Sequence, residues 1–203
     1  DFVNGDEMVG LYLRTKMGRF PAFAFGTKEN GAMFSHMIVM YAYGLYKQGF
    51  VHEGHKVLQS IYRLHQNTAA SKVYPQITEY IGPEGRGMYG YLTGSASWLV
   101  FTMLTQVFGV RGDGGDLVLE PKLVREQFRK DGTADVETKF ADHDLKVVYE
   151  NPGLLDYGEY RIGEIKINGQ VMNGVSYDTK VKLLRSSFEH LSNDEKVFIE
   201  GVL

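Results

Sequence analysis

Residues 91–98 contain the residue types needed to bind an anion. A loop ends in Thr93 and Gly94 and continues through three small residues into an apolar stretch that predicts a helix. The free N–H groups and partial positive charge of a helix N-terminus attract anions, glycine lets a ligand approach the backbone, and threonine adds a hydroxyl. Helix capping by Thr93 or Ser95 explains the same residues without a ligand. Spacing alone leaves both interpretations open.

A second group of polar residues precedes and enters another apolar stretch. Lys28 and Glu29 stand before an Asn-Gly pair, and His36 follows among Met, Phe and Ile residues. A histidine beside a bound phosphate would donate a hydrogen bond and could be charged near neutrality. The alternatives are a core histidine for His36 and a solvated ion pair for Lys28 and Glu29.

Neither metal binding nor thiol chemistry is expected. The run His52-Glu53-Gly54-His55 has the wrong spacing for the zinc motif with two histidines four residues apart, and Gly54 weakens a helix there. Residues 112–116 contain too few carboxylates for a calcium loop and favour a linker. The chain has no cysteine.

Three stretches with helical character must position these residues. Residues 32–48 are apolar on nearly all sides, residues 53–66 are amphipathic, and residues 95–108 are again apolar. The irregular stretch 71–94 between the last two is rich in Gly, Pro and Tyr, and long ordered loops usually carry function. Because these helices are buried on most sides, we expect them to belong to a larger helical layer.

The second half of the chain predicts strands instead. A short apolar run occurs at residues 117–119, and runs that predict strands occur near residues 136–140, 145–149 and 197–199. Asn-Gly pairs at Asn168–Gly169 and Asn173–Gly174 are typical of hairpins. We expect an antiparallel β-sandwich. Residues 1–112 carry 10 basic against 7 acidic side chains, and residues 113–203 carry 12 against 18. We therefore place a domain boundary between residues 112 and 113.

Composition limits the classes of partner. With 43% hydrophobic and 23% charged residues, a packed core is expected, and a net charge of −3 gives no reason to expect nucleic acid. No apolar run is long enough to suggest a membrane span, and no cysteine is present, which fits the cytoplasm. The sequence starts without Met or a signal pattern, so we expect it to begin mid-protein and to lack an N-terminal part.

Three segments together resemble glycoside hydrolase family 94, the cellobiose and chitobiose phosphorylase family. They are GTKENGAMFSH (26–36), YPQITEYIGPEGRGMYGYLTGSASW (74–98) and FGVRGDGGDLVLEPKL (108–123). The resemblance implies that residues 1–112 form the C-terminal helices of an (α/α)6 barrel and residues 113–203 a β-sheet domain. The sequence from Gly87 to Leu123 is similar to that of the 1,2-β-oligoglucan phosphorylases within the family.

The resemblance also assigns roles to individual residues. It implies that His36, Thr93 and Gly94 hold phosphate, and that Lys28, Glu29 and Gln76 bind sugar. The loop between Gln76 and Thr93 is shorter than in the family. The family needs no cofactor, since inorganic phosphate is a substrate, and its members are often dimers, so a homodimer is one expected assembly.

One departure from the family concerns catalysis. The family's general acid is an Asp well upstream of the histidine helix, and nothing in this sequence matches it. The expected activity is cleavage of a β-linked gluco-oligosaccharide by phosphate, giving α-glucose 1-phosphate, with the acid and a further phosphate-binding Arg supplied from upstream. Two alternatives remain open: a glucan-processing hydrolase or transferase domain of the same fold, and a non-catalytic carbohydrate-binding module.

Overall fold

The computed structural model describes residues 15–73, 76–91, 93–172, 178–192 and 196–203. The chain divides into two compact units, each made of two segments. The first unit contains residues 1–41 and 56–99, and the second contains residues 42–55 and 100–203. The domain boundary predicted at residues 112–113 stays a prediction.

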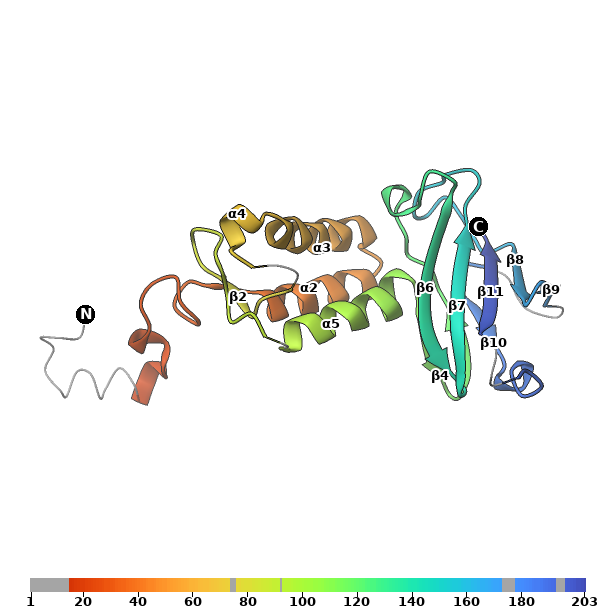
Figure 1. Cartoon of the computed structure of the whole chain (residues 1–203), viewed down its shortest axis with the longest axis horizontal. Coiled ribbons are helices and arrows are strands. Elements are labelled where there is room, and N and C mark those ends of the chain that lie inside the picture. The colour runs from red at the N-terminus through yellow and green to blue at the C-terminus, as the bar shows by residue number, and fades with distance from the viewer. Residues whose placement is uncertain (1–14, 74–75, 92, 173–177, 193–195) are drawn as a thin grey trace, which may run out of the picture. The chain divides into compact units, whose positions relative to one another are not determined.

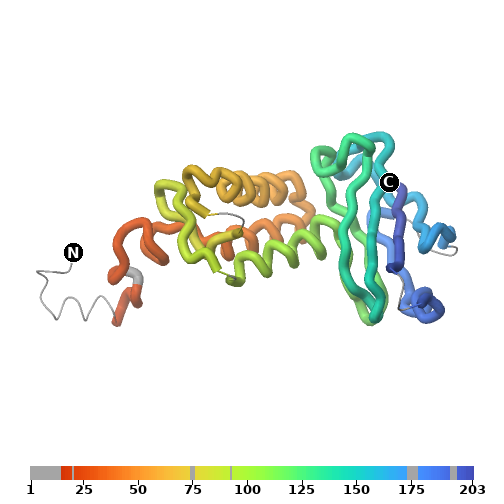
Figure 2. Tube along the Cα trace, in the orientation of Figure 1, coloured from red at the N-terminus to blue at the C-terminus, as the bar shows by residue number. Residues whose placement is uncertain are grey.

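Helices and one small sheet build the first unit (Figure 1, Figure 2). A 3-10 turn at Phe20–Ala22 leads to strand β1 (Met33–Phe34) and directly into helix α2 (Ser35–Lys47). Helix α3 (Val51–Gln66) is followed by the short α4 (Thr68–Ser71), by strands β2 (Tyr80–Ile81) and β3 (Gly87–Met88), and by helix α5 (Gly94–Thr102). The strands pair antiparallel in the order β1-β2-β3. Strand β1, at the edge of this sheet, thus runs directly into α2.

Helix α3 starts at Val51, two residues before the stretch predicted from periodicity, and it runs through Gly54. A β-carbon at Gly54 would lie 2.6 Å from the ring of Tyr46, so the glycine makes room for this fully buried tyrosine. Glu53 in the first turn and Arg63 in the last complement the helix dipole. The gain from burying Tyr46 offsets the low helix propensity of glycine.

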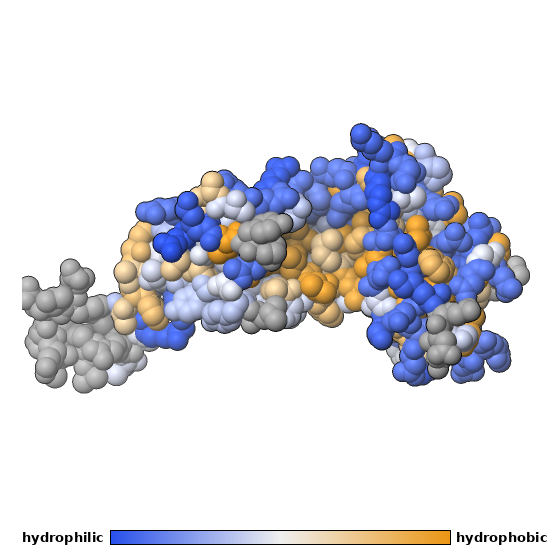
Figure 3. Space-filling model, viewed as in Figure 1, coloured by the Kyte–Doolittle hydropathy of each residue, from blue (hydrophilic) through white to orange (hydrophobic). Residues whose placement is uncertain are grey.

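Helix α5 ends in a π-helical turn. Residues Met103–Val107 have π geometry, and the N–H of Phe108 donates to the carbonyl of Met103. Figure 3 shows apolar side chains gathered over α2 and α5. Large apolar side chains that are exposed on these two helices include Met37, Met40 and Tyr41 on α2 and Val100 and Phe101 on α5.

Two sheets make up most of the second unit. Strands β4 (Val110–Asp113), β5 (Asp116–Leu119) and β10 (Val181–Leu183) form an antiparallel sheet in the order β10-β5-β4. The larger sheet has the order β6-β7-β11-β8-β9, with β6 at Thr133–Phe140, β7 at His143–Glu150, β8 at Glu164–Ile167, β9 at Gln170–Val171 and β11 at Val197–Val202. Strand β11 runs parallel to β7 and antiparallel to β8. Fully buried side chains from these strands form the core, including Leu117, Leu145, Tyr149, Ile165, Leu183 and Ile199.

The predicted fold class, helices of an (α/α)6 barrel followed by an antiparallel β-sandwich, is wrong. The described residues form a few short helices and three small sheets in a mixed α/β arrangement. The larger sheet is itself mixed, because β11 pairs parallel with β7. Alternating residues specify that a segment is a strand, but they specify neither its partner nor its direction. Hairpin signals suggested only antiparallel neighbours.

The hairpin predictions had different outcomes. The β6–β7 turn at Ala141 and Asp142 and the β8–β9 turn at Asn168 and Gly169 all have positive φ angles, as hairpin turns of type I′ require. The second Asn-Gly pair, Asn173–Gly174, lies outside the described residues.

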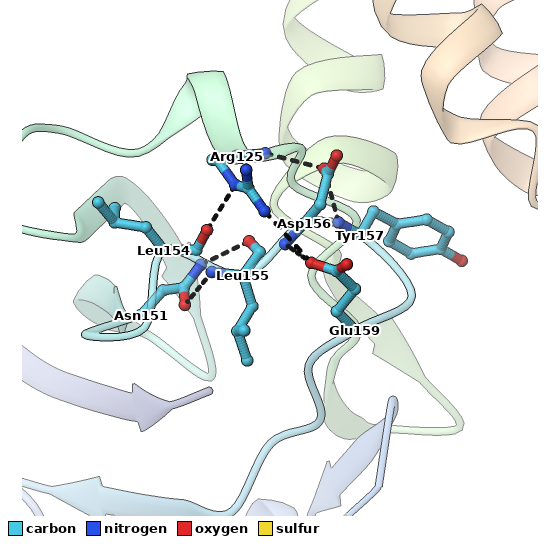
Figure 4. Close-up of polar contacts among 7 residues, drawn as sticks. All are labelled: Arg125, Asn151, Leu154, Leu155, Asp156, Tyr157 and Glu159. Atoms are coloured by element: carbon cyan, nitrogen blue, oxygen red, sulfur yellow. Dashed lines mark hydrogen bonds and ion pairs between the residues drawn. The ribbon is translucent and has the colours of Figure 1, made fainter.

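A loop after β7 is held by Arg125 (Figure 4). The guanidinium of Arg125 donates to the carbonyl of Leu154 at 2.6 Å and reaches Glu159 at 3.4 Å, while its backbone N–H donates to Asp156. Asn151 closes the same loop by exchanging two hydrogen bonds with the backbone of Leu155. This network satisfies backbone groups that no strand pairs.

In the described part of the chain, no helix has the length and apolar character needed to cross a membrane.

Candidate functional site

The starts of helices α2 and α5 meet at His36 and Gly94. A β-carbon at Gly94 would lie 2.9 Å from Cε1 and 3.1 Å from Nδ1 of His36, closer than side chains normally approach. The imidazole therefore lies directly against the backbone of Gly94. The structure brings together two residues that are 58 positions apart and that the sequence analysis assigned to one site.

Two helix N-termini therefore share this location. Helix α2 begins at Ser35 and helix α5 at Gly94, and neither has an acidic residue in its first turn. Each N-terminus carries about half a positive charge from the aligned peptide dipoles, within roughly one turn of the end. The point where they meet is suited to an anion by its backbone alone.

Buried polar atoms at the same location lack partners. Among the residues that the structure describes, Ser35 Oγ, His36 Nε2 and Ser95 Oγ are buried and make no hydrogen bond. Both serines are completely buried as residues. A buried polar atom without a partner costs about 1–3 kcal/mol, so three of them in two adjoining helix starts call for an explanation.

Thr93 caps helix α5, as the alternative interpretation predicted. Its Oγ1 accepts a 3.2 Å hydrogen bond from the N–H of Ser95, and its carbonyl accepts from the hydroxyl of Ser97. Capping uses one acceptor position of the hydroxyl and leaves its O–H to donate. The capping role and an anion-binding role for Thr93 are therefore compatible.

His36 differs from a satisfied core histidine. It is half-buried, and its ring lies 6.0 Å from that of Trp98, centroid to centroid. A core histidine normally has a hydrogen bond at each buried nitrogen. In the described part of the chain, Nε2 of His36 has none.

Lys28 and Glu29 do not pair with each other. Glu29 pairs with Arg19, whose Nε donates to Oε1 at 2.8 Å, and this hydrogen bond holds the pKa of the Glu29 carboxyl below its usual range. The ammonium of Lys28 lies 4.5 Å from the ring centre of Tyr89 and 5.9 Å from that of Phe23. Lys28 is thus held by cation–π contacts.

Gln76 lies beside the same tyrosine. A β-carbon at Gly90 would be 2.2 Å from Nε2 of Gln76, so the amide covers the backbone between Tyr89 and Tyr91. Lys28 and Gln76, two of the three predicted sugar-binding residues, therefore converge on the segment 89–91. Glu29 is placed with Arg19 instead.

Sequence reasoning missed four residues of this region: Ser35, Ser95, Tyr89 and Tyr91. The serines were read only as small residues or caps, because spacing does not reveal that a hydroxyl is buried without a partner. The two tyrosines were not singled out, although the pattern Tyr-Gly-Tyr just before Thr93 is a signal that could have identified them.

No family model matches the chain, and no curated protein matches it. Within the described ranges, no group of three or more His, Asp or Glu side chains could hold a metal ion. The site offers hydroxyl, imidazole and backbone N–H donors.

Proposed function

We propose that the chain binds inorganic phosphate beside Gly94 and His36, at the starts of α2 and α5, as the phosphate- and sugar-binding part of a cytoplasmic inverting β-glucoside phosphorylase. One observation carries the proposal: the starts of α2 and α5 meet at this contact, with three buried donors or hydroxyls that lack partners. The resemblance to glycoside hydrolase family 94 at residues 26–36 and 74–98 supports the same assignment.

Phosphorolysis suits a site of this kind. An oxygen of phosphate forms a bond to the anomeric carbon from the face opposite the leaving group, and the glycosidic C–O bond breaks. The leaving oxygen takes a proton from a carboxylic acid, and the product is α-glucose 1-phosphate. Because phosphate is itself the nucleophile, no second carboxylate is needed as a base, unlike in an inverting hydrolase.

The residues of this chain would hold and orient the nucleophile. A proton on Nε2 lets His36 donate to a phosphate oxygen, and the hydroxyls of Ser35, Ser95 and Thr93 can donate to the others. The N–H groups in the first turns of α2 and α5 stabilise the negative charge. Holding the phosphate in line with the anomeric carbon lowers the entropic part of the barrier.

A titration of the purified chain with inorganic phosphate at constant ionic strength tests the proposal. We expect calorimetry or ³¹P NMR to show saturable phosphate binding. Sulfate should compete with phosphate for the site. His36→Ala removes a hydrogen bond to an anion worth about 1.5–3 kcal/mol, which corresponds to a loss of about tenfold or more in affinity. His52→Ala, a change at an exposed histidine of α3, is the matched control and should leave affinity unchanged.

Absence of saturable phosphate binding, or equal affinity in the His36→Ala and wild-type proteins, would refute the proposal. Turnover is a separate matter, because we assign no general acid to this chain. Incubation of the chain alone with β-linked glucobioses and phosphate should give no glucose 1-phosphate. Clear turnover would show that a carboxyl group of this chain protonates the leaving oxygen.

A further inference from the structure

A continuous row of aromatic rings crosses the three-stranded sheet next to the anion site. Phe34 contacts Tyr80 at 5.7 Å between ring centroids, Tyr80 contacts Tyr89 at 5.5 Å, and Tyr89 contacts Tyr91 at 5.8 Å. Tyr80 is buried, whereas Tyr89 is 41% and Tyr91 56% exposed. Two aromatic rings at one end of the row are therefore accessible to a ligand. We call Tyr89 and Tyr91 the tyrosine platform.

Polar groups surround the tyrosine platform. The ammonium of Lys28 lies on the ring of Tyr89, and the amide of Gln76 lies over Gly90, between the two tyrosines. The hydroxyl of Tyr91 reaches Oε2 of Glu79 at 3.5 Å. The platform thus combines apolar ring surface with an ammonium, an amide and a carboxylate.

The backbone at this place is strained. Lys28 has φ +44° and Tyr89 has φ +57°, although neither is glycine. Each such conformation costs on the order of 1 kcal/mol, and glycine would adopt it without that cost. Lys28 and Tyr89 contact each other through their side chains, and such backbone conformations also occur at ligand sites.

The platform adjoins the anion site along the chain and through the sheet. Phe34, at the other end of the aromatic row, directly precedes Ser35 and His36. The N–H of Ser35 also donates to the carbonyl of Glu79 at 3.0 Å. A ligand on the platform would therefore lie close to an anion held at the start of α2.

The chemistry of the platform fits a neutral ligand with one apolar face and a polar edge. A single positive and a single negative group give no preference for a polyanion. A pyranose ring offers C–H groups to an aromatic face, and its hydroxyls can bond to an amide, a carboxylate and an ammonium. We propose that Tyr89 and Tyr91 stack against pyranose rings of a β-linked gluco-oligosaccharide, while Gln76, Lys28 and Glu79 bond its hydroxyls. The choice of a glucoside rests on the proposed function.

Titration of the chain with β-linked glucobiose, glucotriose and glucotetraose tests the platform. Affinity should rise with length as a second ring reaches the tyrosines. Tyr89→Ala and Tyr91→Ala should each weaken the longer sugars by roughly tenfold, the size of one aromatic contact. Tyr91→Phe keeps the ring and should retain most of the affinity. Tyr62→Ala, a change at a tyrosine of α3 that is 57% exposed, is the matched control and should have no effect.

Phosphate affinity, measured on the same proteins, separates the two proposals. Unchanged phosphate affinity in Tyr91→Ala together with weakened sugar binding supports the platform and excludes a general loss of structure. Sugar binding that depends on the tyrosines in a protein that binds no phosphate would keep the platform and refute the phosphorylase proposal. Wild-type protein that binds no sugar, or Tyr91→Ala that binds it as tightly as wild type, would overturn the platform. If Tyr89→Ala does not fold, Tyr91→Ala decides.

Discussion

Two histidines of the first unit, His65 on α3 and His36 on α2, have opposite surroundings. His65 is buried with both ring nitrogens bonded: Nδ1 to the carbonyl of Ile61 at 2.8 Å, and Nε2 to the N–H and hydroxyl of Thr78 at 3.1 and 3.0 Å. Nε2 of His36 is buried and has no partner in the described part of the chain. A polar group that is satisfied within the fold contributes to stability, whereas one left unsatisfied costs free energy and is available to a ligand.

The largest expected effect is on stability at the satisfied histidine. His65→Ala leaves the N–H of Thr78 buried without its acceptor and opens a cavity, so we expect a loss of about 2–4 kcal/mol in the free energy of unfolding. His36→Ala removes no hydrogen bond to the residues that the structure describes and should cost less than about 1 kcal/mol. Urea unfolding of both variants measures the difference. Equal losses would mean that the two histidines do not differ as we infer.

The next largest effect concerns the glycines that adjoin each histidine site. A β-carbon at Gly87 would lie 2.7 Å from Cγ2 of Thr78, the partner of His65, and one at Gly94 lies 2.9 Å from the ring of His36. Overpacking of a tight site typically costs about 1–3 kcal/mol, which we expect for Gly87→Ala. Gly94→Ala should displace a ring that has no bond to lose and reduce phosphate affinity with a smaller stability loss. Unfolding and phosphate titrations of the two variants check this. A larger loss of stability in Gly94→Ala than in Gly87→Ala would contradict it.

A smaller effect is expected at the hydroxyls. Ser95→Ala removes a buried oxygen that has no partner, so the unliganded protein should keep its stability or gain up to about 1 kcal/mol. The thermal stabilisation by phosphate should at the same time decrease. Thr78→Val, which removes a hydroxyl that lies within hydrogen-bond distance of both Nε2 of His65 and the carbonyl of Tyr80 and can donate to one of them, should destabilise the protein instead. A large stability loss in Ser95→Ala would show that its hydroxyl has a partner within the fold.

The smallest effect tests the same contrast on the surface. Arg19 holds the pKa of Glu29 below its usual value, so the pair contributes to stability above the unfolded-state pKa and loses that contribution as the pH falls through the folded-state pKa. Arg19→Gln should raise the pKa of Glu29 toward its ordinary value, as measured by NMR titration of the carboxyl carbon. The pKa of Asp131, lowered by hydrogen bonds from Thr133, should stay unchanged. An unshifted Glu29 would mean that Arg19 is not its partner.

Much of the local structure could be predicted from the sequence, but its assembly could not. Apolar and amphipathic periodicity placed α2, α3 and α5 within a few residues, and Asn168–Gly169 predicted a hairpin that is present. The fold class was wrong because pairing partners depend on packing between distant segments. Strand β11 lies parallel to β7 although more than 40 residues separate them, and no local pattern specifies this.

For the candidate site, the sequence determined the donors and the structure decided which of them meet. The sequence predicted a helix that starts near Thr93 and Gly94, where Thr93 could cap the helix or the helix start could bind an anion. Only the structure shows that His36 contacts Gly94 and that Glu29 pairs with Arg19. It also shows that the hydroxyls of Ser35 and Ser95 are buried without partners among the described residues. Residue type fixes which hydrogen bonds a group can make, but only tertiary packing decides which of those bonds the fold leaves unmade.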